Sequence, residues 1–171
     1  MELKKTGKAQ TIAVLAGEFD LKDDKATRHP VKAIYVHNKH GNQNPRLRLQ
    51  YDFTILELQK PIDLSSGSRT PCLPKPEDTY FNEKTRFTVS GWGGSTDIYF
   101  DENNPVKPKY PDHLKYTNVE YCSSDWRRAT YCHGCHANRP WEICTRSNRG
   151  TGACTGDSGG KILLDSLKDT L

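Results

Sequence analysis

Apolar residues occur along this chain in short runs rich in β-branched and aromatic side chains, and turn-forming residues separate the runs. Runs of four to eight such residues between Gly, Pro, Asn and Asp predict β-strands, because a helix needs a longer stretch with a 3.6-residue period. The spacing of the runs therefore predicts an all-β domain. The expected strands are Thr11–Gly17, Val31–His37, Phe53–Leu58 (mostly buried and ended by Pro61), Phe87–Ser90, Leu114–Tyr121 and Ile143–Thr145.

The segments between these runs are polar. Asp20–Pro30 is charged and turn-like, and we interpret His37–Arg48 and Ser95–His113 as exposed loops. Pro61–Pro76 contains four prolines and a Ser-Ser-Gly-Ser run, a composition typical of a connector. A chain of 171 residues suits one domain whose two lobes are joined by such a connector. The last residues, 161–171, match no expected strand and could form a short amphipathic helix.

One serine lies in an unusual concentration of glycine. Ser158 belongs to the run Cys154-Thr-Gly-Asp-Ser-Gly-Gly160, which follows Gly150-Thr-Gly-Ala153. Glycines let the backbone adopt turns that a side chain forbids and let N–H groups approach a ligand closely. Nucleophilic attack by a serine hydroxyl needs a base to take its proton and N–H donors to stabilise the oxyanion that forms. The run therefore predicts an acyl-transfer site with Ser158 as the nucleophile.

Three further stretches occur in a consistent order with this run: Ala16–Asp20 (AGEFD), Tyr51–Leu58 (YDFTILEL) and Val89–Gly93 (VSGWG). Together the four stretches resemble the chymotrypsin-like serine endopeptidases, over about Ile12 to Gly160. The resemblance implies a trypsin-like double Greek-key antiparallel barrel, here truncated at both ends. It divides the chain into a remnant of the first barrel (12–60), a connector between barrels (61–86), a second barrel with the nucleophile loop (87–160) and a divergent tail (161–171).

The resemblance also implies a role for particular residues in peptide-bond hydrolysis. Ser158 corresponds to the nucleophile and Asp52 to the carboxylate that orients the catalytic histidine, while the N–H groups of Gly156 and Ser158 correspond to the oxyanion hole. Gly152 takes the place of the floor of the specificity pocket, where an aspartate would select Lys or Arg. Asp157 corresponds to the carboxylate that receives a newly cut N-terminal ammonium, and we expect its partner to be absent here.

The histidine of the catalytic triad is missing from its expected place. The family carries it in an Ala-Ala-His-Cys segment upstream of the triad aspartate, and no part of this chain matches that segment. His37 and His40 precede Asp52 but lie on the expected loop, and His29, His113, His133 and His136 are the other histidines. Without a base the proton on Ser158 has no acceptor, so we predict that the chain is inactive alone. A second reading is a non-catalytic serine protease homologue that binds a protein partner.

The six cysteines suit an oxidising compartment. By the resemblance, the partners of Cys72 and Cys154 are missing, and Cys144 closes a loop with Cys122, Cys132 or Cys135. Cys132-His-Gly-Cys-His136 also fits c-type haem attachment or part of a zinc site. Chance spacing is the better account of this pattern, so we expect no cofactor and no metal, and a small metal-binding module at Cys132–His136 stays as an alternative.

Composition and charge reduce the number of functional classes that fit this chain. Hydrophobic residues make up 34% of the chain, a low share that predicts a thin core. The net charge of +4 comes from basic and acidic residues mixed along the chain, which argues against nucleic-acid binding. No apolar run approaches the length of a membrane span, and no apolar segment follows Met1–Lys5 to complete a signal peptide. We expect a monomer that acts on a protein or peptide substrate and, by family, a secreted protein.

Overall fold

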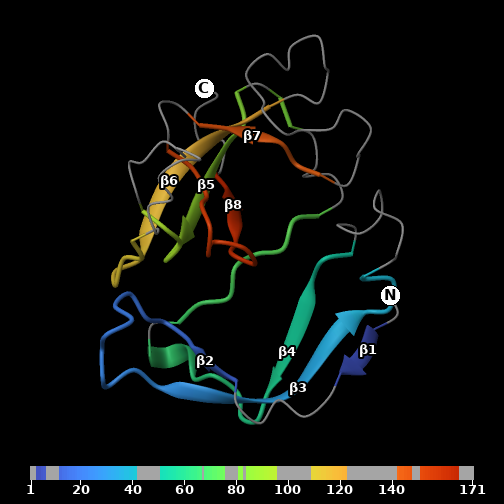
Figure 1. Cartoon of the computed structure of the whole chain (residues 1–171), viewed down its shortest axis with the longest axis vertical. Helices are drawn as coiled ribbons and strands as arrows, with labels where there is room; N and C mark the ends of the chain where they lie inside the picture. The colour runs from blue at the N-terminus through green and yellow to red at the C-terminus, as the bar shows by residue number, and fades with distance from the viewer. Residues whose placement is uncertain are drawn as a thin grey trace, which may run out of the picture. The chain divides into compact units, whose positions relative to one another are not determined.

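The computed structural model describes residues 3–6, 12–41, 51–66, 68–75, 81–82, 84–95, 109–122, 142–147 and 151–165. These residues form β-strands and one short 3-10 helix, and none of them lies in an α-helix. The chain divides into two compact units, Met1–Cys72 and Leu73–Leu171 (Figure 1). The predicted all-β class is confirmed. No described helix is both long enough and apolar enough to cross a membrane.

The first unit is built around one long strand. β3 (Arg28–His37) pairs antiparallel with β1 (Leu3–Thr6), β2 (Ala13–Leu15) and β4 (Thr54–Leu58). β2 lies against the first part of β3, and β1 and β4 lie on either side of its second part. The strands expected within Thr11–Gly17, Val31–His37 and Phe53–Leu58 are thus confirmed. β1 was not predicted from the sequence, because it carries one apolar residue among four.

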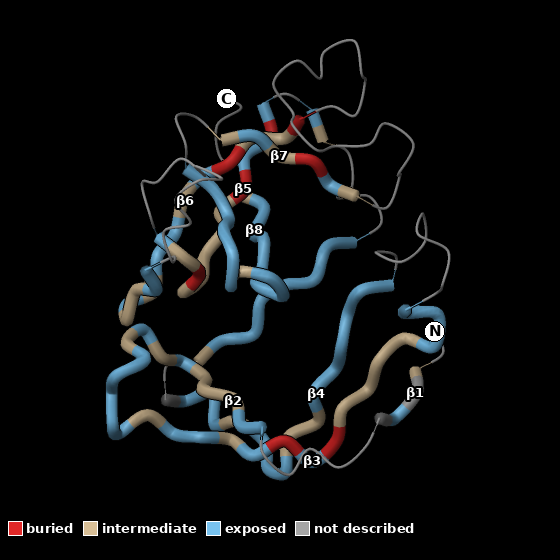
Figure 2. Tube along the Cα trace, in the orientation of Figure 1, coloured by how far each residue is buried: buried red, intermediate tan, exposed pale blue. Residues whose placement is uncertain are grey.

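The described residues of this unit that are buried all lie on β3. Val31 and Ala33 expose 3% and 0% of their surface, whereas Ile55 and Leu56 on β4 expose 43% and 39%. The prediction that Phe53–Leu58 is mostly buried is therefore wrong. In Figure 2 most of β4 has the pale blue of exposed residues. β4 pairs with β3 alone among the described strands, so no further described strand lies beside its side chains.

The second unit holds a four-stranded antiparallel sheet. The central strands β5 (Arg86–Gly91) and β6 (Lys115–Tyr121) pair along their whole length, and the sheet order is β7-β6-β5-β8 (Figure 1). β7 (Thr145–Arg146) and β8 (Ile162–Leu164) lie on its two sides. A short amphipathic helix at 161–171 was a wrong expectation for residues 162–164, because they form a strand that pairs with β5.

The core of the second unit lies at the middle of the sheet and beside β7. Phe87 on β5 pairs with Val119 on β6, and the two residues expose 2% and 3% of their surface. The ring of Phe81 packs edge-on against Phe87 at 5.2 Å between centroids. Cys122 and Cys144 are also buried, and the Cys122 N–H donates to the Cys144 carbonyl at 2.8 Å. This core fixes β5 and β6, whose ends carry the candidate site.

Candidate active site

The loop that carries Ser158 spans residues 151–160, between β7 and β8 in the second unit. It consists of two successive turns, which are closed by hydrogen bonds from the Asp157 N–H to the Cys154 carbonyl (3.0 Å) and from the Gly160 N–H to the Asp157 carbonyl (2.9 Å). Gly156 and Gly159 have φ angles of 98° and 84°, a region in which a side chain is strained. The glycines thus permit the two turns, and Ser158 lies within the second turn with an exposed side chain.

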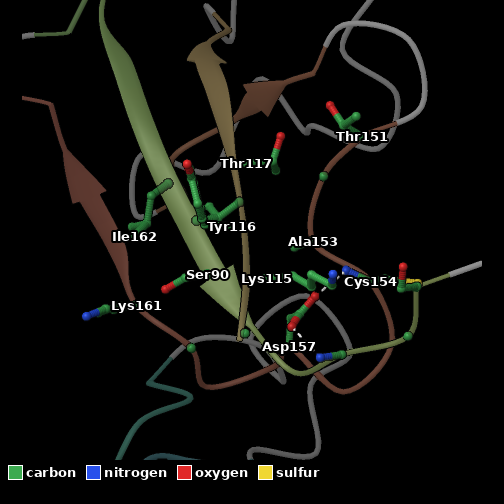
Figure 3. Close-up of a pocket in the computed structure, with 17 residues that line it drawn as sticks. Ser90, Lys115, Tyr116, Thr117, Thr151, Ala153, Cys154, Asp157, Lys161 and Ile162 are labelled. Atoms are coloured by element: carbon green, nitrogen blue, oxygen red, sulfur yellow. Dashed lines mark hydrogen bonds between the residues drawn. The ribbon is translucent and has the colours of Figure 1, made fainter. Parts of the chain in front are cut away.

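The carboxylate of Asp157 joins this loop to the end of β5. Its Oδ1 accepts the Gly93 N–H at 2.8 Å, and its Oδ2 accepts the Cys154 N–H at 2.9 Å (Figure 3). A Cβ on Gly91 or Gly93 would overlap this carboxylate, so both positions need glycine. Two main-chain donors of its own unit thus bind Asp157, and the expectation that the N-terminal ammonium is absent stays a prediction. The sequence signal that marks this contact is the pair of glycines in Val89–Gly93.

Gly156, the first of the two expected oxyanion donors, is packed on both sides. A Cβ at this position would lie 3.1 Å from a ring carbon of Tyr110 and 3.3 Å from the Cα of Gly93. The Gly94 N–H donates to the neighbouring Thr155 carbonyl at 2.8 Å. The backbone on the N-terminal side of Ser158 is therefore held against residues 93–94, and a side chain at 156 would be strained by its φ of 98° and crowded by Tyr110 and Gly93. Packing of this kind fixes where the Gly156 N–H points.

A cleft of about 510 Å³ lies beside the same loop (Figure 3). The end of β5, the start of β6 and both flanks of the nucleophile loop line it, including Lys115, Gly152, Asp157 and Lys161. Ser158 is not among the lining residues, although Asp157 and Gly160 on either side of it are. Gly152 has a φ of 154°, which disfavours the aspartate that would select basic side chains.

Asp52 lies in the first unit, two residues before β4. Its side chain is 66% exposed, and its Oδ1 lies 3.7 Å from Nδ1 of His40. His40 is placed by a turn in which its N–H donates to the His37 carbonyl at 3.0 Å. The structure thus brings His40 to Asp52. The N–O distance is longer than a hydrogen bond, and the carboxylate is not buried as a triad aspartate would be.

Tyr51, directly before Asp52, has a φ of 59°, which is costly for a residue with a side chain. Its ring stacks on His37 with 4.3 Å between centroids and an interplanar angle of 9°. The ammonium of Lys39 lies 5.7 Å from the centre of the same ring. These contacts hold Tyr51 in its strained conformation. They therefore also fix the backbone at the next residue, Asp52.

The strongest electrostatic cluster of the first unit lies across β3 and β4. Hydrogen bonds from Lys32 and Tyr35 to Glu57 lower the pKa of the Glu57 carboxyl below its ordinary value. The same two bonds raise the pKa of Lys32 and of Tyr35 above their ordinary values. Lys32 is exposed, Tyr35 and Glu57 are half-buried, and each is paired within the cluster, so they link two strands and offer no free base.

The remaining sequence predictions concern cysteine and histidine. Cys72 and Cys154 are free and exposed, as expected of residues without their family partners. Cys132–His136 lies outside the described residues, as do His133 and His136 themselves, so the metal-binding alternative stays a prediction. Among the described residues no group of three His, Cys, Asp or Glu side chains could hold a metal ion.

The order of the candidate site residues along the chain, and the two antiparallel units, can now be compared with those of known proteins. A family model described as Trypsin matches residues 4–166. This chain belongs to the trypsin family. The match extends beyond Ile12–Gly160 at both ends and includes β8.

Individual relatives of this trypsin-family chain are distant. It is 24% identical over 163 residues to a chymotrypsin of Phaedon cochleariae, covering 94% of this chain and 53% of the relative. It is 28% identical over 146 residues to mouse kallikrein-1, covering 84% of this chain and 49% of the relative. The chain therefore spans about half the length of these relatives.

A solved structure supports the same fold. Mouse neuropsin, a serine protease, matches with a TM-score of 0.68 at 22% identity, covering 90% of this chain and 62% of that one. The trypsin-like fold predicted from the sequence is confirmed by this likeness and by the family model.

Proposed function

We propose that this trypsin-family chain carries the nucleophile of a serine endopeptidase, with Ser158 attacking the carbonyl carbon of a peptide bond in a protein or peptide substrate. The anchoring of Asp157 is the observation that supports this most, because it fixes the backbone beside an exposed Ser158. The N–H groups of Gly156 and Ser158 would stabilise the oxyanion, and Asp52 would orient a histidine base. With glycine at 152, we do not expect preference for Lys or Arg at the cleavage site.

The division of the chain follows from the same assignment. We assign 12–60 to a remnant of the first barrel, 61–86 to the connector, 87–160 to the second barrel with the nucleophile loop and 161–171 to a divergent tail. The division of the chain into compact units at Cys72 and Leu73 supports the connector, because it falls inside 61–86. By family we also infer an extracellular location.

We further propose that these 171 residues do not turn over substrate by themselves. No Ala-Ala-His-Cys segment is present, and losing the catalytic histidine of a serine protease lowers turnover by about 10⁶, or about 8 kcal/mol of barrier. His40 lies beside Asp52, but the 3.7 Å separation and the exposure of both side chains are a poor match for a hydrogen-bonded, buried triad pair. We therefore do not assign the role of base to His40.

A fluorophosphonate probe, which reacts with activated serines, tests both statements. We expect the purified chain to label slowly, and added imidazole to accelerate labelling because it supplies the absent base. Mass spectrometry should place the adduct on Ser158, and Ser158→Ala should abolish it. His40→Ala should leave the rate unchanged.

The possible failures can be told apart. Fast stoichiometric labelling without imidazole, lost in Ser158→Ala, would show that the chain is active, and its loss in His40→Ala as well would make His40 the base. No labelling that depends on Ser158 at any imidazole concentration would overturn the nucleophile assignment and leave a non-catalytic homologue that binds a protein.

A further inference from the structure

The N–H group of Gly156 belongs to the same peptide group as the carbonyl of Thr155. This carbonyl accepts the Gly94 N–H at 2.8 Å. A trans peptide group is planar and its C=O and N–H point in opposite directions, and no cis peptide bond occurs among the described residues. The bond from Gly94 therefore directs the Gly156 N–H away from residue 94. Because Gly156 is exposed, a bound molecule can reach this N–H.

Glycine at 156 does not keep this orientation by itself. A residue with a side chain is confined mostly to negative φ, whereas glycine adopts either sign at similar cost, and Gly156 has a φ of 98°. The Thr155–Gly156 peptide group can therefore turn over at little cost unless neighbouring atoms prevent it. Its orientation depends on its contacts and not on its own two residues.

Tyr110 supplies one of these contacts. Its ring lies beside the α-carbon of Gly156, because a Cβ built at Gly156 would lie 3.1 Å and 3.8 Å from two ring carbons. The α-carbon of Gly93 would lie 3.3 Å from the same Cβ. Gly93 is buried and its N–H is bound by Asp157, so the ring is the contact that a substitution can remove while the main chain stays in place.

The main chain around Tyr110 places its ring at Gly156. The Ser95 N–H donates to the Lys109 carbonyl at 2.8 Å, and Ser95 directly follows the residue whose N–H binds the nucleophile loop. Pro111 follows Tyr110 and favours an extended backbone at Tyr110. Tyr110 exposes 53% of its surface, so its ring contacts the loop without forming part of the core.

We propose that Tyr110 is a positioning residue, whose ring keeps the Thr155–Gly156 peptide group in the orientation that leaves the Gly156 N–H available to an oxyanion. Its part in catalysis rests on the proposed function, in which Gly156 is an oxyanion donor, whereas its contact with the peptide group does not. Ring carbons make the contact, so the phenol hydroxyl is not required. The sequence gave no signal for this role, because Tyr110 lies within the expected surface loop Ser95–His113.

Imidazole-assisted labelling of Ser158 by the fluorophosphonate probe tests the role in the full chain, because the phosphoryl oxygen of the probe takes the place of the oxyanion. Loss of a whole oxyanion donor slows such a reaction by about 10²–10³, so Tyr110→Ala, which loosens the donor without removing it, should slow labelling about tenfold. Tyr110→Phe keeps the ring and should label at the wild-type rate.

Tyr116→Ala is the matched control. Tyr116 lies on β6 and exposes 77% of its surface, so its removal should leave the labelling rate unchanged. The urea midpoints of the three variants should stay close to that of the wild type, because both tyrosines are exposed. A slower rate in Tyr110→Ala at an unchanged midpoint then reports the orientation of the donor and not the stability of the fold.

Hydrogen exchange at the Gly94 amide measures the contact without reference to catalysis. When the Thr155–Gly156 peptide group turns over, its carbonyl leaves Gly94, so this amide should exchange several-fold faster in Tyr110→Ala than in the wild type. The Ser95 amide, which binds the Lys109 carbonyl, should not change.

The outcomes separate this role from the proposed function. Labelling of Tyr110→Ala at the wild-type rate, an equal loss in Tyr110→Phe or Tyr116→Ala, or an unchanged Gly94 amide would overturn the role of Tyr110. If Ser158 is labelled in no variant and not in the wild type, the proposed function fails, and exchange at Gly94 alone decides whether the ring holds the peptide group.

Discussion

Replacing Asp157 with alanine removes the group that joins the nucleophile loop to β5. The carboxylate accepts the Gly93 N–H at 2.8 Å and the Cys154 N–H at 2.9 Å. Gly93 is buried and Cys154 is exposed, so water can replace the lost acceptor only at Cys154. Because a hydrogen bond to a charged acceptor contributes about 1.5–3 kcal/mol, we expect the free energy of unfolding to fall by about 2–3 kcal/mol, nearly all of it from Gly93.

Urea unfolding followed by circular dichroism measures this loss, and Asp165→Ala is the matched control. Asp165 is half-buried like Asp157, and the Thr88 hydroxyl donates to it at 2.8 Å; this hydroxyl can donate instead to Asn118 Oδ1 at 3.1 Å, so no donor is left unpaired and we expect a loss under about 1 kcal/mol. Imidazole-assisted labelling of Ser158 should fall in Asp157→Ala and not in the control, because only the first change frees the loop. A loss in Asp157→Ala no larger than in Asp165→Ala, with labelling unchanged, would refute the anchoring role.

Three further results are expected. Gly93→Ala should destabilise the chain more than Gly41→Ala, and urea unfolding of both variants compares them. A Cβ at 93 overlaps the Asp157 carboxylate, whereas a Cβ at Gly41 meets nothing within 4 Å and only the φ of 76° there resists substitution. The pKa of Glu57 is lower in the folded chain than its ordinary value of 4.5, so the ionised carboxylate stabilises the fold fully above 4.5, and this stabilisation is lost as pH falls through the folded pKa. Glu57→Gln should therefore flatten the acid side of the plot of unfolding free energy against pH. An unchanged plot would contradict this. Iodoacetamide should label Cys72 and Cys154, which are free and exposed, whereas Cys122 and Cys144 are disulfide-bonded and should react only after reduction; peptide mapping that finds them labelled without a reductant would contradict the fold.

Local sequence patterns predict most of the strands of this chain, because a strand is signalled by residues that are close together in the sequence. Val31–His37 and Leu114–Tyr121 are examples, and they became β3 and β6. β1 escaped prediction because its place depends on pairing with β3 and not on its own apolar content. The predicted burial of β4 was wrong for a related reason. An apolar strand is buried only if another layer covers it, and the residues of the strand do not show whether such a layer exists.

The same contrast between local sequence signals and tertiary contacts applies to the candidate site. Ser158 was identifiable because glycines flank it in the sequence, whereas the partners of Asp157 were not, since any residue except proline can donate a main-chain N–H. The proximity of His40 to Asp52 depends on a turn after β3 and on the strained conformation of Tyr51, which no propensity favours. Residue identity therefore predicts the reactive groups, and tertiary contacts decide which groups meet.

The anchoring of Asp157 has a consequence for what limits catalysis in this chain. The Asp157 carboxylate has two donors within its own unit, so the order of the nucleophile loop requires no donor from elsewhere. Under the proposed function, one deficit that remains is the base. Imidazole from solution can take the proton but is not held in position, and a positioned group has an effective molarity of about 10⁵ M or more. Labelling of Ser158 should therefore rise in proportion to imidazole without saturating, and saturation at low concentration would instead indicate a binding site for the base.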